Sequence, residues 1–323
     1  MQRWLRNRRT LPVAGYDARH GRWHDQPDHR LDRREQLTVA TYNIWFNDLH
    51  AEQRHRAIAG LLAREQPDVM VFQEVTPAAM DIICAQPWVR QHYRRAAMVG
   101  EAVGNYGMLV LSRVPIRAAT YTRLPTQLSR GYLTVGLAVN GVVQNVVSVH
   151  LESGKRNRHV RARQLGCLFR TFRDTADVIV LGDFNMRDDE DDALDPAFQD
   201  MWPSLRPEEP GYTEDTSINH MRYDMKDKHR HVRFDRVLVK GSAWTPSGIE
   251  LLGREPIDPA LPRVFPSDHF GVLCRLQWAG VTDPAGAREL SAGASAGWSR
   301  PAWFPTRAGS RRSALRTGRS PGP

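Results

Sequence analysis

The chain has 323 residues, 41% of them hydrophobic, so it can bury a substantial core and fits one large domain or two ordinary ones. Its net charge is +9, but residues 1–36 carry nine Arg against five acids (+4) and residues 277–323 carry seven Arg against two acids (+5), which leaves residues 37–276 neutral. The basic pI near 9.9 is therefore weak evidence that the middle of the chain binds nucleic acid.

The predicted elements run from a charged leader to a low-complexity tail. Residues 1–36 are rich in Arg, His and Asp with little periodicity, so we expect a flexible leader. Residues 37–276 alternate β-rich runs with helical patterns, which is typical of one layered α/β domain. We predict strands over 37–46, 67–75, 107–113, 132–141, 142–151, 177–184, 232–241 and 271–278, and helices over 54–66, 77–84 and 158–174. Residues 277–323 are rich in Gly, Ala, Ser, Pro and Arg and predict a disordered tail.

The connections between these strands indicate the fold class. Many of them are short and hairpin-like instead of uniform βαβ crossovers. We therefore expect two packed mixed or antiparallel sheets with helices outside.

Cysteine usage and hydropathy exclude several classes of protein. Cys84, Cys167 and Cys274 are too few for a disulfide framework and lack metal-type spacing, so we expect reduced thiols in the cytoplasm. No stretch approaches the roughly 18 consecutive apolar residues of a membrane span, and the first residues lack the apolar segment of a secretory signal. We expect no membrane association.

Polar side chains of the kind that bind metal or phosphate stand at the ends of several predicted strands. They are Asn43, Glu74, His150, Asp183 and Asn185. Asp235 lies within the predicted strand 232–241, and Asp268 and His269 stand just before the last strand. Strand ends present side chains at one rim of a sheet, so this recurrence predicts a single assembled site. Because Glu, Asp and Asn oxygens are hard ligands, a divalent cation such as Mg²⁺ or Mn²⁺ with a phosphate substrate is the natural chemistry.

Six ordered motifs carry a family resemblance. They are "TYNIWF", "FQEV", "GMLVLSRVPI", "HLE", "GDFN" and "PSDHFG". In this order they resemble the endonuclease/exonuclease/phosphatase superfamily, and "HLESGKRNRHVRARQL", "VRFDRVLVKG" and "FPSDHFGVL" are most similar to its 5′-tyrosyl-DNA phosphodiesterases. The resemblance implies a four-layered α/β sandwich and metal-dependent hydrolysis of a phosphoester bond. It also implies a role in DNA repair and a nucleic-acid substrate, above all DNA, that is hydrolysed at a 5′-tyrosyl adduct or by endo- or exonucleolytic cleavage. We expect a monomer without an obligate protein partner.

The resemblance also implies roles for individual residues. Glu74 is expected to be the principal metal ligand, with Asn43 contacting metal or phosphate and Asp268 assisting the metal or the water. Asp183 is expected to orient and deprotonate the attacking water, and Asn185 to hydrogen-bond that water or the transition-state oxygens.

Two histidines complete the expected catalytic set. His269 is expected to contact phosphate with Asp235 as its carboxylate partner, which raises the pKa of the imidazole. His150 is expected to donate to a nonbridging phosphate oxygen from the opposite side.

Further residues are candidates for substrate binding. Arg187 follows "GDFN" and can engage two phosphate oxygens at once, and Tyr106 and Arg130 are candidates of the same kind. Arg161 lies in a basic segment that could line a phosphate track, with a solvated helix face or a fixed partner as the alternatives. The acidic run "DDEDD" at residues 188–192 lacks the spacing and central Gly of an EF-hand loop and predicts a solvated loop or a first helical turn.

The resemblance leaves the substrate open. At Glu214 this chain reads "YTEDT", where the close relatives have Trp in "TWDT". A phosphatase or phospholipase of the sphingomyelinase or inositol-phosphate type keeps the same chemistry with another substrate. A non-catalytic module that binds nucleic acid through the Arg-rich ends is the alternative from another class, and the intact acidic and histidine residues argue against it.

Overall fold

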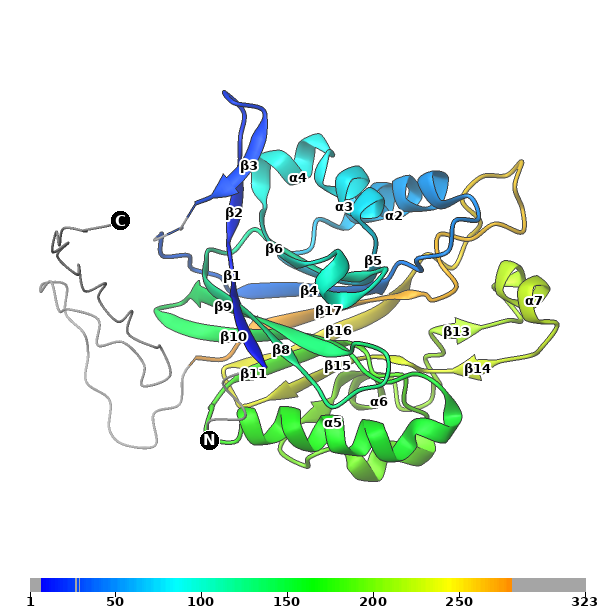
Figure 1. Cartoon of the computed structure of the whole chain (residues 1–323). Helices are drawn as coiled ribbons and strands as arrows, with labels where there is room; N and C mark the ends of the chain where they lie inside the picture. The colour runs from blue at the N-terminus through cyan, green and yellow to red at the C-terminus, as the bar shows by residue number, and fades with distance from the viewer. Residues whose placement is uncertain (1–6, 27, 29, 281–323) are drawn as a thin grey trace, which may run out of the picture. The chain divides into compact units, whose positions relative to one another are not determined.

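The computed structural model describes residues 7–26, 28 and 30–280 (Figure 1). The predicted tail lies outside the described residues from residue 281 onward. The first two residues of the predicted tail, Gln277 and Trp278, belong to the last strand, so the tail begins later than predicted.

Two large mixed sheets form the centre of the described chain. The first has seven strands in the order β1 (Arg8–Leu11), β8 (Ile116–Arg123), β9 (Gly131–Val139), β10 (Val142–His150), β11 (Val178–Asp183), β15 (Asp235–Lys240) and β12 (Gln199–Asp200). The second has eight strands in the order β16 (Trp244–Leu252), β17 (Gly271–Trp278), β4 (Gln36–Asn43), β5 (Val69–Val75), β7 (Gly107–Ser112), β6 (Arg94–Met98), β2 (Ala14–Asp17) and β3 (Arg22–Asp25). A separate short hairpin joins β13 (Glu214–Asp215) to β14 (His231–Val232).

Helices cover the outer faces of both sheets (Figure 1). The eight-stranded sheet carries α2 (Ala51–Glu65), α3 (Pro77–Cys84) and α4 (Pro87–His92), and the seven-stranded sheet carries α5 (Arg158–Thr171). Shorter helices are α6 (Met201–Leu205), α7 (His220–Lys226), η1 (Glu101–Val103), η2 (Lys155–Asn157) and η3 (Asp188–Ala193). The layers are therefore helix, sheet, sheet and helix, and the predicted four-layered sandwich is confirmed.

Strand β5 shows how the sequence builds these layers. Val69 and Val71 join the core between the two sheets, whereas Met70 and Phe72 pack in the core under the helices. Side chains of a strand alternate between faces, so a strand buried on both sides must be apolar throughout, as "VMVF" is. Each fully buried side chain of this kind contributes about 1.5–3 kcal/mol.

The flexible leader predicted over residues 1–36 is wrong for its described part. β1 pairs antiparallel with β8, and β2 pairs with both β3 and β6. Leu11 and Val13 are buried in the core between the sheets. The compact unit of the chain thus starts well before residue 37, and its strands there are held by backbone ladders that a charged sequence does not reveal.

The remaining expectations about the chain are met in part. Cys84 and Cys274 are buried and Cys167 is half-buried, and all three are free thiols. Within the described residues, none of the helices has the length and apolar character needed to cross a membrane. The strands β6, β8 and β16 were not predicted.

Candidate active site

Two parallel strand pairs bring the predicted strand-end residues together. β4 runs parallel to β5 in one sheet, and β10 runs parallel to β11 in the other. Asn43, His150 and Asp183 are the last residues of β4, β10 and β11. In the seven-stranded sheet, His150 is the register partner of Asp183, and Asp183 is the register partner of Asp235. Three functional side chains therefore stand in one row across neighbouring strands.

Glu74 enters the site from a β-bulge. The register between β5 and β7 shifts between Gln73 and Val75, and Glu74 has a φ of 60°. A bulge re-aims a side chain, and a non-glycine residue in the left-handed region is strained, which is common at functional sites. The backbone N–H of Phe46 donates to Glu74 Oε2 at 3.3 Å.

Asp183 is the centre of a hydrogen-bond network that joins the two sheets. Asn43 Nδ2 donates to Asp183 Oδ2 at 3.0 Å from the eight-stranded sheet. Asn185 donates its backbone N–H to Oδ1 at 2.8 Å and its Nδ2 to Oδ2 at 3.1 Å. Burial, followed by the charge of Asp235, raises the pKa of Asp183 to about 7. A carboxylate with a pKa near neutrality is suited to accept a proton at physiological pH.

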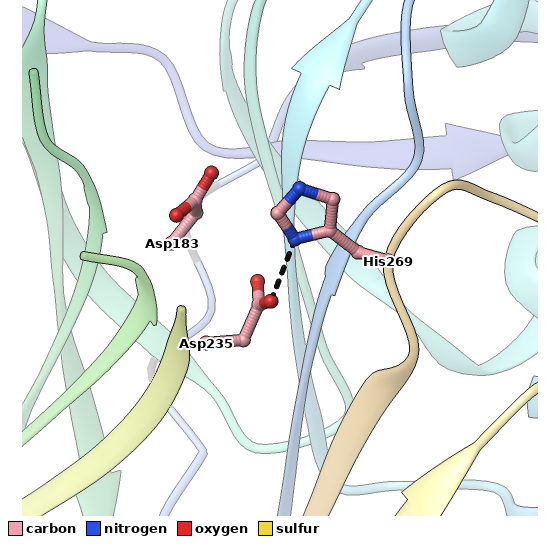
Figure 2. A group of neighbouring side chains, drawn as sticks. All are labelled: Asp183, Asp235 and His269. Atoms are coloured by element: carbon pink, nitrogen blue, oxygen red, sulfur yellow. Dashed lines mark hydrogen bonds and ion pairs between the residues drawn. The ribbon is translucent and has the colours of Figure 1, made fainter. Parts of the chain in front are cut away.

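His269 and Asp235 form a buried ion pair at 2.7 Å between Nδ1 and Oδ2, with Asp183 beside them (Figure 2). Burial alone would lower the pKa of His269, but the carboxylates of Asp235, Asp268 and Asp183 outweigh burial and raise that pKa well above its usual range. The imidazole is therefore positively charged. The expected partnership of these two residues is present in the structure.

Ser267 holds the loop that carries His269. Its Oγ donates to the carbonyl of Asn43 at 2.7 Å and accepts the backbone N–H of His269 at 3.2 Å. Sequence reasoning assigned no role to Ser267, although this residue lies inside the "PSDHFG" motif.

The residues around His150 determine which of its ring nitrogens carries the proton. Arg130 Nη1 donates to His150 Nδ1 at 2.8 Å, and because a guanidinium has only donors, Nδ1 must accept. Burial and the charge of Arg130 lower the pKa of His150 well below its usual range, so the ring is neutral with its proton on Nε2. Nε2 lies 3.5 Å from Asp183 Oδ2 and 3.9 Å from Glu74 Oε1.

Aromatic and basic side chains border this site. The ring of Tyr106 stacks on Phe46 at 4.6 Å and lies 6.0 Å from His150, with the Arg130 guanidinium 5.6 Å from its centre. The guanidinium of Arg187 lies 5.7 Å from the ring of Phe234. That ring is itself 5.9 Å from the ring of His269. The structure thus places Tyr106, Arg130 and Arg187 around the predicted site.

The prediction that Arg161 lines a phosphate track is wrong. Arg161 is fully buried, and its guanidinium bonds Glu190 through Nε at 2.8 Å and Nη2 at 2.6 Å. Its Nη1 donates to the carbonyls of Glu152 and Gly154, each at 2.8 Å. The fixed partner left open as an alternative is therefore Glu190, which is also buried. The acidic run forms the predicted helical turn, η3, but Glu190 is not solvated.

The site has donors suited to a divalent cation. Ligand atoms of Asp183, Asp235 and His269 lie within 4.8 Å of one another and could hold a metal ion. A charged imidazole has no lone pair to offer, however, so carboxylate oxygens are the better ligands here. Burial and the charge of Asp268 raise the pKa of Glu74, and burial also raises the pKa of Asp268. The neighbouring cations compensate these two carboxylates only in part, so a divalent cation would stabilise their charged forms.

Comparisons with known proteins agree with this geometry. A model described as the Endonuclease/Exonuclease/phosphatase family matches residues 40–269. Tyrosyl-DNA phosphodiesterase 2 of Xenopus laevis is 32% identical over 258 residues, which cover 74% of this chain and 66% of that protein. The Homo sapiens protein of the same name is 29% identical over 269 residues, which cover 77% of this chain and 70% of that protein.

A solved structure is similar as well. The crystal structure of D. rerio TDP2 complexed with single strand DNA product has a TM-score of 0.68 and 25% sequence identity, and the match covers 76% of this chain and 100% of that chain. The present chain spans about two thirds of the length of the curated relatives it matches.

Proposed function

The chain belongs to the endonuclease/exonuclease/phosphatase family, and from this we propose that it is a phosphodiesterase that uses Mg²⁺ or Mn²⁺ to hydrolyse the bond between tyrosine and a DNA 5′ phosphate. The observation that carries the proposal is the convergence of Glu74, Asp183 and His269 from both sheets on one site. The tyrosyl-DNA substrate is supported by the names of the relatives, and DNA as the partner by the D. rerio complex.

Asp183 is the general base in this proposal. Its carboxylate is fixed by Asn43 and Asn185 and has a pKa of about 7, so it can orient a water molecule and accept its proton. The side chain of Asn185 also bonds the carbonyl of Leu151 at 3.1 Å, which fixes the amide. Attack of the oriented water on phosphorus then breaks the bond to the tyrosyl oxygen.

The two histidines stabilise the charge that develops on the phosphoryl oxygens. His269 is cationic because of Asp235, and His150 presents a proton on Nε2 that forms no hydrogen bond with the described residues. Preorganised donors of this kind lower the barrier because they need no reorganisation during the reaction.

A divalent cation would be held by Glu74 with Asp268 and Asn43. When bound, it would supply Lewis-acid stabilisation of negative charge on the phosphoryl group. Arg187 and Tyr106 lie where they would contact the flanking parts of the substrate. Arg130 is buried and acts on the site by binding His150. A monomeric state and a cytoplasmic location stay predictions from the sequence.

A substrate panel tests the proposal. Purified protein is assayed with Mg²⁺, with Mn²⁺ and with EDTA against a 5′-phosphotyrosyl oligonucleotide, unmodified DNA and RNA, sphingomyelin and an inositol phosphate. We expect metal-dependent release of tyrosine from the first substrate. Glu74→Gln is the inactive control. Preferred turnover of the lipid or the inositol phosphate would instead favour the phospholipase or phosphatase alternative, and binding without turnover of any substrate would favour the non-catalytic module.

A further inference from the structure

Glu214 is a buried carboxylate beside the site to which the proposed reaction gives no role. It lies on β13, at the base of the hairpin that carries α7 (Figure 1). Only 2% of the residue is exposed, and two arginines contact its carboxylate. Arg230 Nη1 donates to Oε2 at 3.0 Å, and Arg222 Nε lies 2.6 Å from Oε1.

The contact with Arg222 is close but poorly aligned. Neither Arg222 Nε nor Glu214 Oε1 has a hydrogen-bond partner within the described part of the chain, so their 2.6 Å approach is an ion pair without hydrogen-bond geometry. The same Nε lies 3.8 Å from Asp268 Oδ2. One guanidinium therefore stands between a carboxylate of the site and a carboxylate outside it.

Arg222 would bind Asp268 directly if Glu214 did not hold it. A guanidinium and a carboxylate free to meet form charge-assisted hydrogen bonds of about 2.7–2.9 Å. Such a bond would occupy the Asp268 oxygens that a cation needs. At 3.8 Å, Arg222 and Asp268 form a long ion pair without a hydrogen bond, and the shorter contact of 2.6 Å is made with Glu214.

We propose that Glu214 is a positioning residue, which retains Arg222 so that the carboxylate of Asp268 stays free for the divalent cation. The inference rests on the proposed metal site but not on the tyrosyl-DNA substrate. The inference also explains why this chain has Glu214 at the position where the similar phosphodiesterases have Trp.

A double-mutant cycle on metal affinity tests this role. The full chain is titrated with Mn²⁺ without substrate, and free Mn²⁺ is followed by electron paramagnetic resonance. Glu214→Gln should weaken Mn²⁺ binding about tenfold, the size typical for residues that orient metal ligands. Arg222→Ala alone should not weaken it, and Glu214→Gln combined with Arg222→Ala should restore the affinity to within about threefold of wild type, because residues in contact are not additive.

Controls separate this role from a structural one. Asp224→Asn changes the same helix, α7, by breaking an exposed ion pair with Arg263 at 2.7 Å, and should leave Mn²⁺ affinity unchanged. Thermal unfolding confirms that each variant is folded. If Glu214→Gln does not fold, Glu214→Asp keeps the charge but shortens the side chain, and should weaken Mn²⁺ binding less.

Three results would overturn the inference: unchanged Mn²⁺ affinity in a folded Glu214 variant, no recovery in the double variant, or a rise in the KM for DNA with metal affinity intact. If no substrate of the panel is hydrolysed, the result of the double-mutant cycle still stands, because Mn²⁺ affinity is measured without substrate. The two proposals can therefore fail separately.

Discussion

The molecule contains two clusters of charged side chains that come close together in the sequence, since Asp183 of one lies just before Asp188 of the other and Asp235 is next to Arg236. The η3 arginine cluster joins the acids of η3 and Asp200 to three buried arginines, and consists of Arg161, Arg233, Arg236, Asp188, Glu190, Asp191 and Asp200. The active-site cluster consists of Glu74, Asp183, Asp235, Asp268, His269 and His150 with Arg130. Both are built from the same kinds of side chain, but their charges are balanced differently.

In the η3 arginine cluster, four acids face three arginines, and two of these acids, Asp188 and Asp191, are wholly or partly exposed to solvent. Asp200 accepts from Arg233 at 2.6 Å and from Arg236 at 2.9 Å, and Arg161 holds Glu190. In the active-site cluster, carboxylates exceed the cations His269 and Arg130, and burial together with mutual repulsion raises the pKa of Glu74 and of Asp183. Removing one partner of a buried ion pair destabilises a fold, whereas an excess of buried carboxylates with shifted pKa values is typical of a functional site.

The largest expected effect comes from removing the base. Asp183→Asn should reduce turnover by roughly 10³-fold to 10⁴-fold, because the amide cannot accept the proton of the water. Single-turnover assays with saturating metal measure this loss. Activity within tenfold of wild type would exclude Asp183 as the base.

Breaking an ion pair of the η3 arginine cluster should affect stability instead of substrate binding. Arg161→Ala leaves Glu190 buried without its partner, which costs about 3–5 kcal/mol of the free energy of unfolding. Urea titration measures this cost, and the KM for DNA should not change in the folded fraction.

A matched variant sharpens this test. Arg161→Met combined with Glu190→Leu removes both charges and should recover part of the stability, because an apolar replacement of a buried pair is often tolerated. A raised KM with normal stability in Arg161→Ala would contradict the separation of the two clusters.

A smaller effect is expected from the ion pair inside the active site. The pKa of His269 is higher in the folded chain than its value of about 6.5 in the unfolded chain. The ion pair with Asp235 therefore contributes its full stabilisation below about pH 6.5, and this stabilisation is lost as the pH rises through the folded pKa. Asp235→Asn should therefore lower the imidazole pKa, followed by NMR, and cost about 1.5–3 kcal/mol at pH 6 in EDTA. An unchanged His269 pKa in this variant would show that Asp235 does not charge the ring.

The smallest effect is expected from deleting residues 281–323, which carry seven Arg and two acids and none of the residues of either cluster. The chemical step should be unchanged. The KM for DNA should rise a fewfold at low salt and lose this difference at high salt, because the deleted residues contribute only electrostatic attraction. A slower single-turnover rate would show that this segment takes part in the reaction.

The sequence predicts the active site well because strands carry it. Apolar runs such as "VIVL" fix the strand, and the polar residue that follows must lie at its end, so Asn43, His150 and Asp183 could be placed without coordinates. The layers follow for the same reason, since the alternation in β5 shows burial on both faces.

The parts that were missed depend on long-range partners. Arg161 and Glu190 are 29 residues apart, and Glu214 meets Arg222 and Asp268 only after α7 has folded over the hairpin. A side chain's neighbours decide whether a basic residue binds phosphate or a buried acid. β1 was missed because only its last residue, Leu11, is buried, so its sequence lacks the apolar pattern of the predicted strands.

Isotope labelling of the product tests the central claim most directly. The 5′-phosphotyrosyl oligonucleotide is hydrolysed with Mg²⁺ in water enriched in ¹⁸O under single-turnover conditions, and both products are analysed by mass spectrometry. Attack on phosphorus by water bound at Asp183 predicts one ¹⁸O atom in the 5′ phosphate of the DNA and none in the released tyrosine. Label in the tyrosine, or no release of tyrosine with metal present, would contradict the account.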